Sequence, residues 1–243
     1  MNSAKSVSII IPTRNEAKNI APLFQQIAAT ATPICEIIFV DANSTDGTRE
    51  AICALTEKFP VRLVDQNLDK PGLAAAVMTG ARTATGDMLL VMDADLSHPP
   101  DKIGDLLAPL TTNEADLVIG SRYIRGGSTP GWPLWRKILS RAGSALAQPI
   151  TGVRDSMCGF FAIERVRLLQ LDPPTIGFKI AFEIIVRGRP NLRVREIPIA
   201  FRDRVRGKSK MSLAIAFRFL LRWIAAIFRR GVSARRPAGE VGR

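Results

Sequence analysis

Short apolar runs rich in β-branched residues alternate with amphipathic segments through the first half of the chain, and this pattern constrains the fold most. The strand-like runs are residues 6–11, 34–41, 61–64, 88–93 and 117–120. The intervening segments have helical spacing or helix-start signals, over residues 15–29, 48–58 and 72–84 and from Pro99 and Pro100 onward. Such alternation predicts an α/β fold with a mostly parallel central sheet and helices on both of its faces.

Polar residues follow three of the predicted strands at the point where each strand ends. They are residues 12–16, which read PTRNE, then Asp41, and then Asp93 and Asp95. Because ligands of open parallel sheets bind at the carboxyl ends of the strands, we expect these residues to line one crevice. The chain has no G-x-G-x-x-G or G-K-[ST] loop after a strand, which argues against dinucleotide-binding and P-loop proteins.

Asp93 and Asp95 are candidate ligands of a divalent cation. They end the most apolar predicted strand, whose two-residue period would place both carboxylates on the same side. Carboxylate oxygens favour Mg²⁺ or Mn²⁺, which can neutralise the charge of a departing diphosphate. A zinc site with several histidines is excluded because His98 is the single histidine of the sequence. The three cysteines form no C-x-x-C pair and are typical of reduced structural thiols.

Positive charge is concentrated toward the end of the sequence. The whole chain has 34 Lys and Arg against 22 Asp and Glu, a net charge of +12. Residues 201–243 hold 12 of these basic residues and 2 of the acidic ones, a net charge of +10. This asymmetry indicates an anionic partner. No nucleic acid is expected as that partner, because the basic tail is interleaved with aliphatic residues and the chain has one tyrosine for base stacking.

Two segments combine basic and apolar residues in the manner of helices that lie on a membrane surface. Residues 132–148 predict one amphipathic interface helix and residues 211–230 a second, followed by a basic, disordered tail over residues 231–243. We expect the second helix and the tail to contact anionic lipid. The alternative is that residues 211–230 form a helix in the protein core and that the tail is solvated. With no run of 18 apolar residues and no signal peptide in the sequence, we expect a peripheral or monotopic protein at the cytoplasmic face of the membrane.

Several sequence blocks resemble those of the inverting, nucleotide-sugar-dependent glycosyltransferases of family 2. They are VSIIIPTRNEAKNI, IIFVDANSTDGT, ATGDMLLVMDADLSHPP and SRYIRGG, in that order. The later blocks WPLWRKILSRAG, DSMCGFF, GFKIAFEI and FRDRVRGKSK are similar to the branch that mannosylates dolichyl or polyprenyl phosphate. The resemblance implies a Rossmann-like GT-A domain over residues 1–210 and transfer of mannose, with inversion, from GDP-mannose to dolichyl or polyprenyl phosphate.

The same resemblance implies roles for individual residues. Asp95, Arg122 and Arg204 would be catalytic. The Mg²⁺ or Mn²⁺ ion would be held by Asp93, Asp95 and Ser97, and the acceptor phosphate by Arg122, Arg136 and Ser140. The donor nucleotide would contact Pro12, Arg14, Glu16, Val40, Asp41, Ala42, Asp93, Ala94 and Lys210.

Three positions depart from the family pattern and leave a second donor open. Arg14 stands where the family usually has an aromatic residue, Ala42 where it has a second acid, and Ser97 where it often has glutamine. Without that acid, transfer from UDP-glucose or another UDP-sugar to undecaprenyl phosphate is the alternative. Asp155 matches a family acid that is either structural or catalytic, and His98 is interpreted as a packing residue. A phosphate acceptor needs no carboxylate base, because its second pKa of ~6 leaves it ionised at neutral pH.

Overall fold

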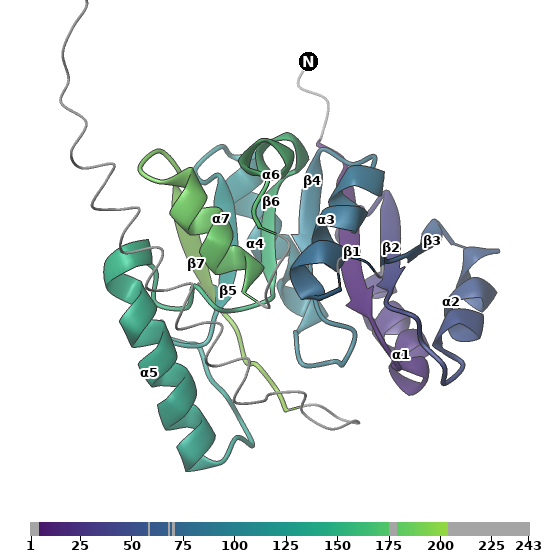
Figure 1. The fold of residues 1–243 in the computed structure, drawn as a ribbon, viewed down its shortest axis with the longest axis horizontal. Coiled ribbons are helices and arrows are strands. Elements are labelled where there is room, and N and C mark those ends of the chain that lie inside the picture. Colours follow the sequence, from purple (N-terminus) through teal and green to yellow (C-terminus); the bar gives the residue numbers. More distant parts are fainter. Residues whose placement is uncertain (1–4, 58, 68, 70, 175–178, 204–243) are drawn as a thin grey trace, which may run out of the picture. The chain divides into compact units, whose positions relative to one another are not determined.

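One mixed sheet of seven strands runs through the described part of the computed structural model, which comprises residues 5–57, 59–67, 69, 71–174 and 179–203. The strand order is β3-β2-β1-β4-β6-β5-β7 (Figure 1). The strands are β1 (Val7–Thr13), β2 (Glu36–Asp41), β3 (Val61–Asp65), β4 (Met88–Val91), β5 (Leu117–Ser121), β6 (Phe161–Glu164) and β7 (Val194–Pro198). The helices are α1 (Ala17–Ala28), α2 (Thr48–Thr56), α3 (Leu73–Thr83), α4 (Ile103–Thr111), α5 (Leu134–Thr151), α6 (Arg165–Leu171) and α7 (Ile180–Gly188), with a 3-10 turn η1 (Pro100–Lys102).

Six of the seven strands share one direction. β1 pairs in parallel with β2 and β4, β2 with β3, and β5 with β7, whereas β6 is antiparallel to both β4 and β5. The prediction of a mostly parallel α/β sheet is confirmed. The sequence analysis missed β6 and β7, and in β7 Arg195 and Glu196 interrupt the apolar pattern.

Helices cover both faces of the sheet, as predicted. In Figure 1, α3, α6 and α7 lie in front of the strands, and α1 and α4 lie behind them. The core between these layers is built from strand residues without solvent exposure, such as Ile9, Ile11, Phe39, Leu90 and Phe161. Apolar side chains on both faces of β1, β2 and β4 explain why these runs read as continuous rather than alternating.

The carboxyl ends of β1, β2 and β4 lie at one edge of the sheet, because these strands are adjacent and parallel. β4 ends at Val91, so Asp93 and Asp95 belong to the loop that follows it. The expectation that strand alternation would place both carboxylates on one side is therefore wrong. The chain leaves the sheet here because the Asp93 amide donates to the His98 ring, at 2.9 Å, instead of to a neighbouring strand.

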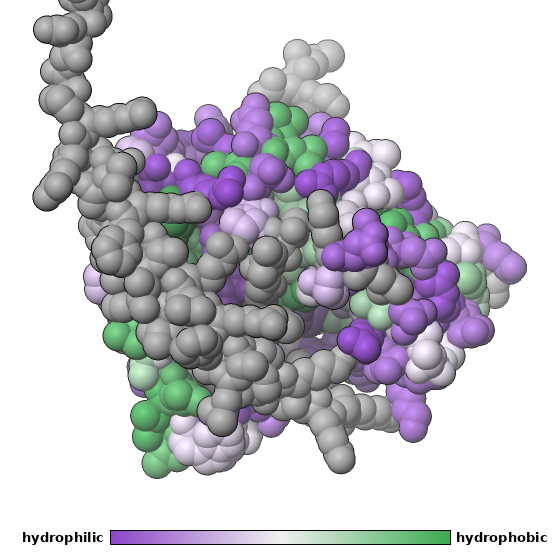
Figure 2. Space-filling model, viewed as in Figure 1, coloured by the Kyte–Doolittle hydropathy of each residue, from purple (hydrophilic) through white to green (hydrophobic). Residues whose placement is uncertain are grey.

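Helix α5 carries most of the exposed apolar surface of the described residues. Figure 2 shows a hydrophobic patch over this helix. Trp132 was predicted to join that surface, but it precedes the helix and is only 7% exposed, because its ring packs against Phe201. None of the described helices is both long and apolar enough to cross a membrane. The predicted helix and tail over residues 211–243 lie outside the described residues. The exposed apolar side chains of α5 are Leu134, Trp135, Ile138, Leu139 and Leu146.

A buried carboxylate ties the amino ends of the strands together, at the edge opposite the polar loops. Glu36 accepts hydrogen bonds from Ser8 Oγ at 2.7 Å, from Thr85 N at 2.6 Å, from Thr85 Oγ1 at 2.7 Å and from Arg62 Nη1 at 2.9 Å. Gly86 is required beside this cluster, because a Cβ atom there would lie 2.5 Å from Ser8 Oγ. Burial alone would raise the pKa of Glu36, but these hydrogen bonds outweigh it and lower the pKa to about 2.

We predict that Glu36→Gln lowers the free energy of unfolding by about 2–3 kcal/mol at pH 7. A carboxyl whose pKa is depressed on folding stabilises the protein above its unfolded pKa, and this stabilisation is lost as the pH falls through the folded value. The difference from the wild type should therefore shrink between about pH 4.5 and pH 2, as measured by urea denaturation. Glu164→Gln is the control, because Glu164 is a half-exposed acid that pairs with Lys5. It should lower the free energy of unfolding by under about 1 kcal/mol. A difference that does not vary with pH would contradict the prediction.

Candidate active site

The loops that follow β1 and β2 are joined by hydrogen bonds. Asn15 has a φ of 56°, which asparagine tolerates and which turns its loop toward the β2–α2 loop. The Asn15 amide donates to Ser44 Oγ at 2.9 Å, and Asn15 Oδ1 accepts from Thr45 N at 2.9 Å. The Glu16 amide donates to Thr48 Oγ1 at 2.8 Å. These bonds hold the two predicted nucleotide-binding loops side by side.

Asp41, a predicted nucleotide contact, is buried and engaged within its own loop. Its carboxylate accepts from Ser44 N at 3.0 Å, from the Ser44 hydroxyl, and from Arg49 Nη1 at 3.2 Å. Arg49 also pairs with Asp65 at the end of β3. Asp41 therefore shapes the loop. Among the other predicted donor contacts, Arg14 is exposed, Val40 and Ala94 are buried, and Pro12, Glu16 and Ala42 are half-buried.

The loop after β4 presents two carboxylates in different surroundings. The Asp93 side chain is 31% exposed, whereas Asp95 is buried and its Oδ1 accepts from Ser97 N at 3.1 Å. The Ser97 hydroxyl is also buried, without a hydrogen-bond partner among the described residues. The three predicted cation ligands thus occupy one short turn.

His98 supports this loop from the inside. Its Nδ1 accepts from the Asp93 amide, so the proton of the neutral ring is on Nε2, which lies 3.9 Å from Asp93 Oδ2. Burial lowers the pKa of His98 and outweighs the opposing charges of Asp93 and Asp95. The ring stacks on Phe160, with centroids 5.0 Å apart, and meets Phe201 edge-on at 5.3 Å. These contacts agree with its interpretation as a packing residue.

The donor set of this loop fits a hard cation. Two carboxylates and a buried hydroxyl supply oxygen ligands, which Mg²⁺ and Mn²⁺ favour. The described residues contain no cluster of three or more His, Cys, Asp or Glu ligands. A cation held here would therefore keep positions open for the oxygens of a ligand such as a diphosphate.

Arg122 follows β5 and forms a buried ion pair with Asp155. Its Nε and Nη2 donate to the two carboxylate oxygens at 2.7 Å each, and its backbone amide donates to Oδ2 at 2.9 Å. Asp155 is held in turn by its own amide, which donates to Glu196 Oε1 at 2.9 Å. Burial alone would lower the pKa of Arg122, but the bidentate bonds and the charge of Asp155 raise it. The guanidinium is thus a fixed cation, and its Nη1 makes no hydrogen bond to a described residue.

The segment after Arg122 folds back on that residue, and Gly127 makes the turn possible. A Cβ atom at Gly127 would lie 2.6 Å from the Ser121 carbonyl oxygen and 2.7 Å from the Arg122 carbonyl carbon. A larger residue would displace the backbone that carries Arg122. This close approach gives the glycines of the SRYIRGG block a structural reason.

Aromatic rings surround the Arg122 guanidinium and connect it to the other predicted acceptor residues. Its Cζ lies 5.1 Å from the ring centroid of Tyr123, 5.6 Å from that of Trp132 and 5.4 Å from that of Phe201. The Tyr123 hydroxyl lies 2.6 Å from Ser140 Oγ and donates to it. The structure therefore brings Arg122 and Ser140 into one cluster.

Arg136 joins the same cluster from the first turn of α5. Its Cζ stacks 3.9 Å from the Trp132 centroid, and its Nη1 pairs with Asp203 at 2.9 Å. Sequence reasoning did not assign the aromatic members to this cluster: Trp132 was predicted to face the membrane surface, and Tyr123 and Phe201 gave no signal of their own. The predicted residues Arg204 and Lys210 lie outside the described residues.

Two further titratable groups lie near the Arg122–Asp155 pair. Burial raises the pKa of the Cys158 thiol to about 12, and the Asp155 charge adds to the effect, so this thiol stays protonated. Lys179 Nζ donates to the Met157 carbonyl oxygen at 3.3 Å. Burial, followed by the charge of Arg122, lowers the pKa of Lys179. Both effects disfavour the charged form of this lysine, and only the GFKIAFEI sequence block pointed to it.

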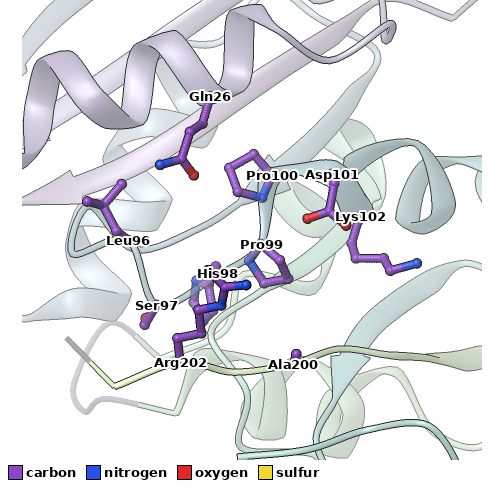
Figure 3. Close-up of a pocket in the computed structure, with 10 residues that line it drawn as sticks. All are labelled: Gln26, Leu96, Ser97, His98, Pro99, Pro100, Asp101, Lys102, Ala200 and Arg202. Atoms are coloured by element: carbon purple, nitrogen blue, oxygen red, sulfur yellow. The ribbon is translucent and has the colours of Figure 1, made fainter. Parts of the chain in front are cut away.

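A cavity of about 180 Å³ opens beside the loop that follows Asp95 (Figure 3). It is lined by Gln26 of α1, by residues 96–102 and by Ala200 and Arg202. Asp93, Asp95 and Arg122 are not among the lining residues. Of the three predicted cation ligands, Ser97 alone lines the cavity.

Comparisons with known proteins agree with this architecture. The glucosyl-3-phosphoglycerate synthase of Mycobacterium tuberculosis, solved with Mn²⁺, UDP and glucosyl-3-phosphoglycerate, superposes with a TM-score of 0.69. The match covers 93% of this chain and 80% of that one at 22% identity. A structure of the same synthase with Mg²⁺ and UDP gives a TM-score of 0.69 at 21% identity, over 93% of this chain and 79% of that one. This likeness confirms the predicted GT-A-like fold.

Curated relatives include two proteins named dolichol-phosphate mannosyltransferase. The one from Pyrococcus furiosus is 39% identical over 221 residues, which are 88% of this chain and 61% of the relative. The one from Saccharomyces cerevisiae is 34% identical over 226 residues, which are 88% of this chain and 84% of the relative. The chain thus spans about three fifths of the archaeal relative and most of the yeast one. The sequence model of glycosyl transferase family 2 matches residues 8–171, and with these relatives it shows that the chain belongs to glycosyl transferase family 2.

Proposed function

We propose that this glycosyltransferase moves mannose from GDP-mannose to dolichyl or another polyprenyl phosphate, giving a polyprenyl-phosphate mannose. The names of the relatives support this proposal, and one feature of the site carries it. The buried acid beside the site, Asp155, has both oxygens engaged by Arg122, so the site offers a fixed cation in place of a carboxylate base. That arrangement suits an acceptor that is already an anion.

The donor would lie at the carboxyl ends of β1, β2 and β4. Its nucleotide would contact Pro12, Arg14, Glu16, Val40, Asp41, Ala42, Asp93, Ala94 and Lys210, as the family resemblance implies. Asp93, Asp95 and Ser97 would hold Mg²⁺ or Mn²⁺, which would neutralise the diphosphate as it departs. Metal ions occur in the structures of the synthase with the same fold.

The acceptor phosphate would be the nucleophile. One of its oxygens forms a bond to the anomeric carbon of mannose while the bond from that carbon to the diphosphate breaks, and the electron pair leaves with GDP. Attack from the opposite face inverts the configuration. Because the phosphate is ionised near neutral pH, no proton has to be removed.

Arg122, Arg136 and Ser140 would hold that phosphate in line, and Arg204 would assist as a further catalytic cation. Arg122 is fixed by Asp155, and Ser140 is fixed by Tyr123. Arg136 is paired with Asp203, so binding of the phosphate would exchange one anionic partner of Arg136 for another. Fixed cations bind a transition-state anion without reorganising, which is where such sites gain most of their effect.

The acceptor is a lipid, so the protein has to reach a membrane, and we propose that α5 does so. Its exposed apolar residues lie beside Lys137 and Arg141, a combination typical of helices at anionic lipid surfaces. Residues 211–230 and the tail over residues 231–243 would add to this contact. We place the protein at the cytoplasmic face of the membrane, as a peripheral or monotopic enzyme.

A UDP-sugar donor with undecaprenyl phosphate is the competing proposal. It rests on Ala42, which leaves the second strand end without the additional acid. The two donors differ in the base and the sugar, while the loop with Asp93 and Asp95 would serve both.

The donor and the cation ligands can be tested together by transfer of radiolabel into an organic-extractable lipid. We expect label from GDP-mannose and not from UDP-glucose, and at least about 100-fold less label with Asp95→Asn. Asp101→Asn changes an exposed acid six residues further along and should keep wild-type activity. Label from UDP-glucose alone would replace the proposed donor. Equal transfer by Asp95→Asn and the wild type would contradict the role of Asp95.

A second prediction tests whether Asp155 positions Arg122 or acts as a general base. Asp155→Asn should destabilise the protein by about 3–5 kcal/mol, because it leaves a buried guanidinium without its counter-charge. It should also raise the dissociation constant for prenyl phosphate roughly tenfold, as measured by equilibrium dialysis, while the pH profile of kcat keeps its shape. Unchanged acceptor binding with loss of the acidic limb of that profile would show that Asp155 is a base.

Membrane contact through α5 can be tested by co-sedimentation with anionic phospholipid vesicles. Ile138→Glu places a charge in the exposed apolar face of α5 and should weaken vesicle binding roughly tenfold. Val166→Glu is the matched control, since Val166 on α6 is 59% exposed and Ile138 is 61% exposed. Equal binding by both variants and the wild type would contradict the proposed role of α5.

A further inference from the structure

Trp132 contacts both of the arginines that would hold the acceptor phosphate. Its ring centroid is 3.9 Å from Arg136 Cζ and 5.6 Å from Arg122 Cζ. The indole is itself held by Phe201, which meets it edge-on at 5.4 Å. The indole thus packs against two like charges, and each of them gains a cation–π contact with it.

The indole N–H of Trp132 is buried and has no hydrogen-bond partner among the described residues. A buried donor without a partner costs stability, and tryptophan N–H groups usually find one when buried. The two guanidinium groups beside this donor make an anion a suitable acceptor for it. This unmet N–H is the second, independent sign of a ligand at the cluster.

The same rings connect the acceptor side to the loop with Asp93 and Asp95. Phe201 contacts Trp132 at one edge and His98 of that loop at 5.3 Å. The row of His98, Phe201 and Trp132 therefore fixes the phosphate-binding arginines relative to the donor-binding loop. In-line transfer depends on that distance, because small displacements of reacting groups lower the rate steeply.

We propose that Trp132 is a further residue of the acceptor site: its indole packs against Arg122 and Arg136 and orients them, and its N–H donates to the phosphate. The inference rests on the proposed function, since it takes a phosphate monoester as the ligand. It adds a neutral donor to a site otherwise made of cations and a hydroxyl. It also gives a reason for a buried tryptophan directly before an exposed helix.

Two variants separate the N–H from the ring, with binding measured by equilibrium dialysis of a radiolabelled, water-soluble prenyl phosphate. Trp132→Phe keeps an aromatic face and removes the donor, and should raise the dissociation constant roughly tenfold. Trp132→Leu also removes the aromatic ring and should raise the dissociation constant roughly 100-fold, with a lower kcat for transfer. Binding of GDP and the thermal midpoint of Trp132→Phe should stay near wild type.

Phe59→Leu changes an exposed aromatic residue beside the opposite edge of the sheet and serves as the control. Inorganic phosphate as the competitor distinguishes a site for any phosphate from one that also needs the prenyl chain. Wild-type affinity in both Trp132 variants, or an equal loss of GDP and prenyl phosphate binding, would overturn the inference. If the wild type binds prenyl phosphate in a Trp132-dependent way but transfers no mannose, the proposed function fails and the inference stands.

Discussion

The buried pair of Arg122 and Asp155 is the interaction on which the rest of the site depends. A charge so deeply buried is stable only when its partner is present and correctly oriented, and here Asp155 engages Arg122 through two side-chain bonds and one backbone bond. Glu196 of β7 fixes the Asp155 backbone, so the edge of the sheet sets the position of the guanidinium. The pair engages both carboxylate oxygens of the acid and holds the arginine as a rigid cation. A site built in this way favours an anionic acceptor over an alcohol that needs a base.

The two halves of the sheet hold the residues of the proposed site by different kinds of interaction. The half with β1 to β3 holds its loops by hydrogen bonds between backbone amides and polar side chains, as between the Asn15 amide and the Ser44 hydroxyl. The half with β5 to β7 holds its functional residues by aromatic packing around Arg122. The loop after β4 lies between them, and His98 connects it to the aromatic side. Antiparallel β6 joins the two halves into one sheet, so the residues proposed to bind the donor and the acceptor share one scaffold.

Much of the fold could be predicted from sequence, because buried parallel strands read as continuous apolar runs. The strand before Asp93 and Asp95 was predicted to run to Asp93, but it ends at Val91, and the turn that follows it has hydrogen bonds to the His98 ring and to the Asp95 carboxylate that no local pattern predicts. β7 was missed because charged residues interrupt its pattern. Trp132 was assigned to an exposed surface, and its burial follows from the contact with Phe201, which is distant in sequence. Local patterns predict elements, whereas long-range packing decides which side chains meet at the site.

The central claim is that the acceptor is a phosphate whose own charge replaces a catalytic base. The most direct test offers the enzyme a polyprenyl phosphate and, separately, the matching polyprenol, with labelled GDP-mannose and Mg²⁺, and measures label in the extracted lipid. The account predicts transfer to the phosphate and none above background to the alcohol, because Asp155 is held by Arg122. Comparable transfer to the alcohol would contradict it, since an alcohol has to lose its proton to a base that this account does not provide.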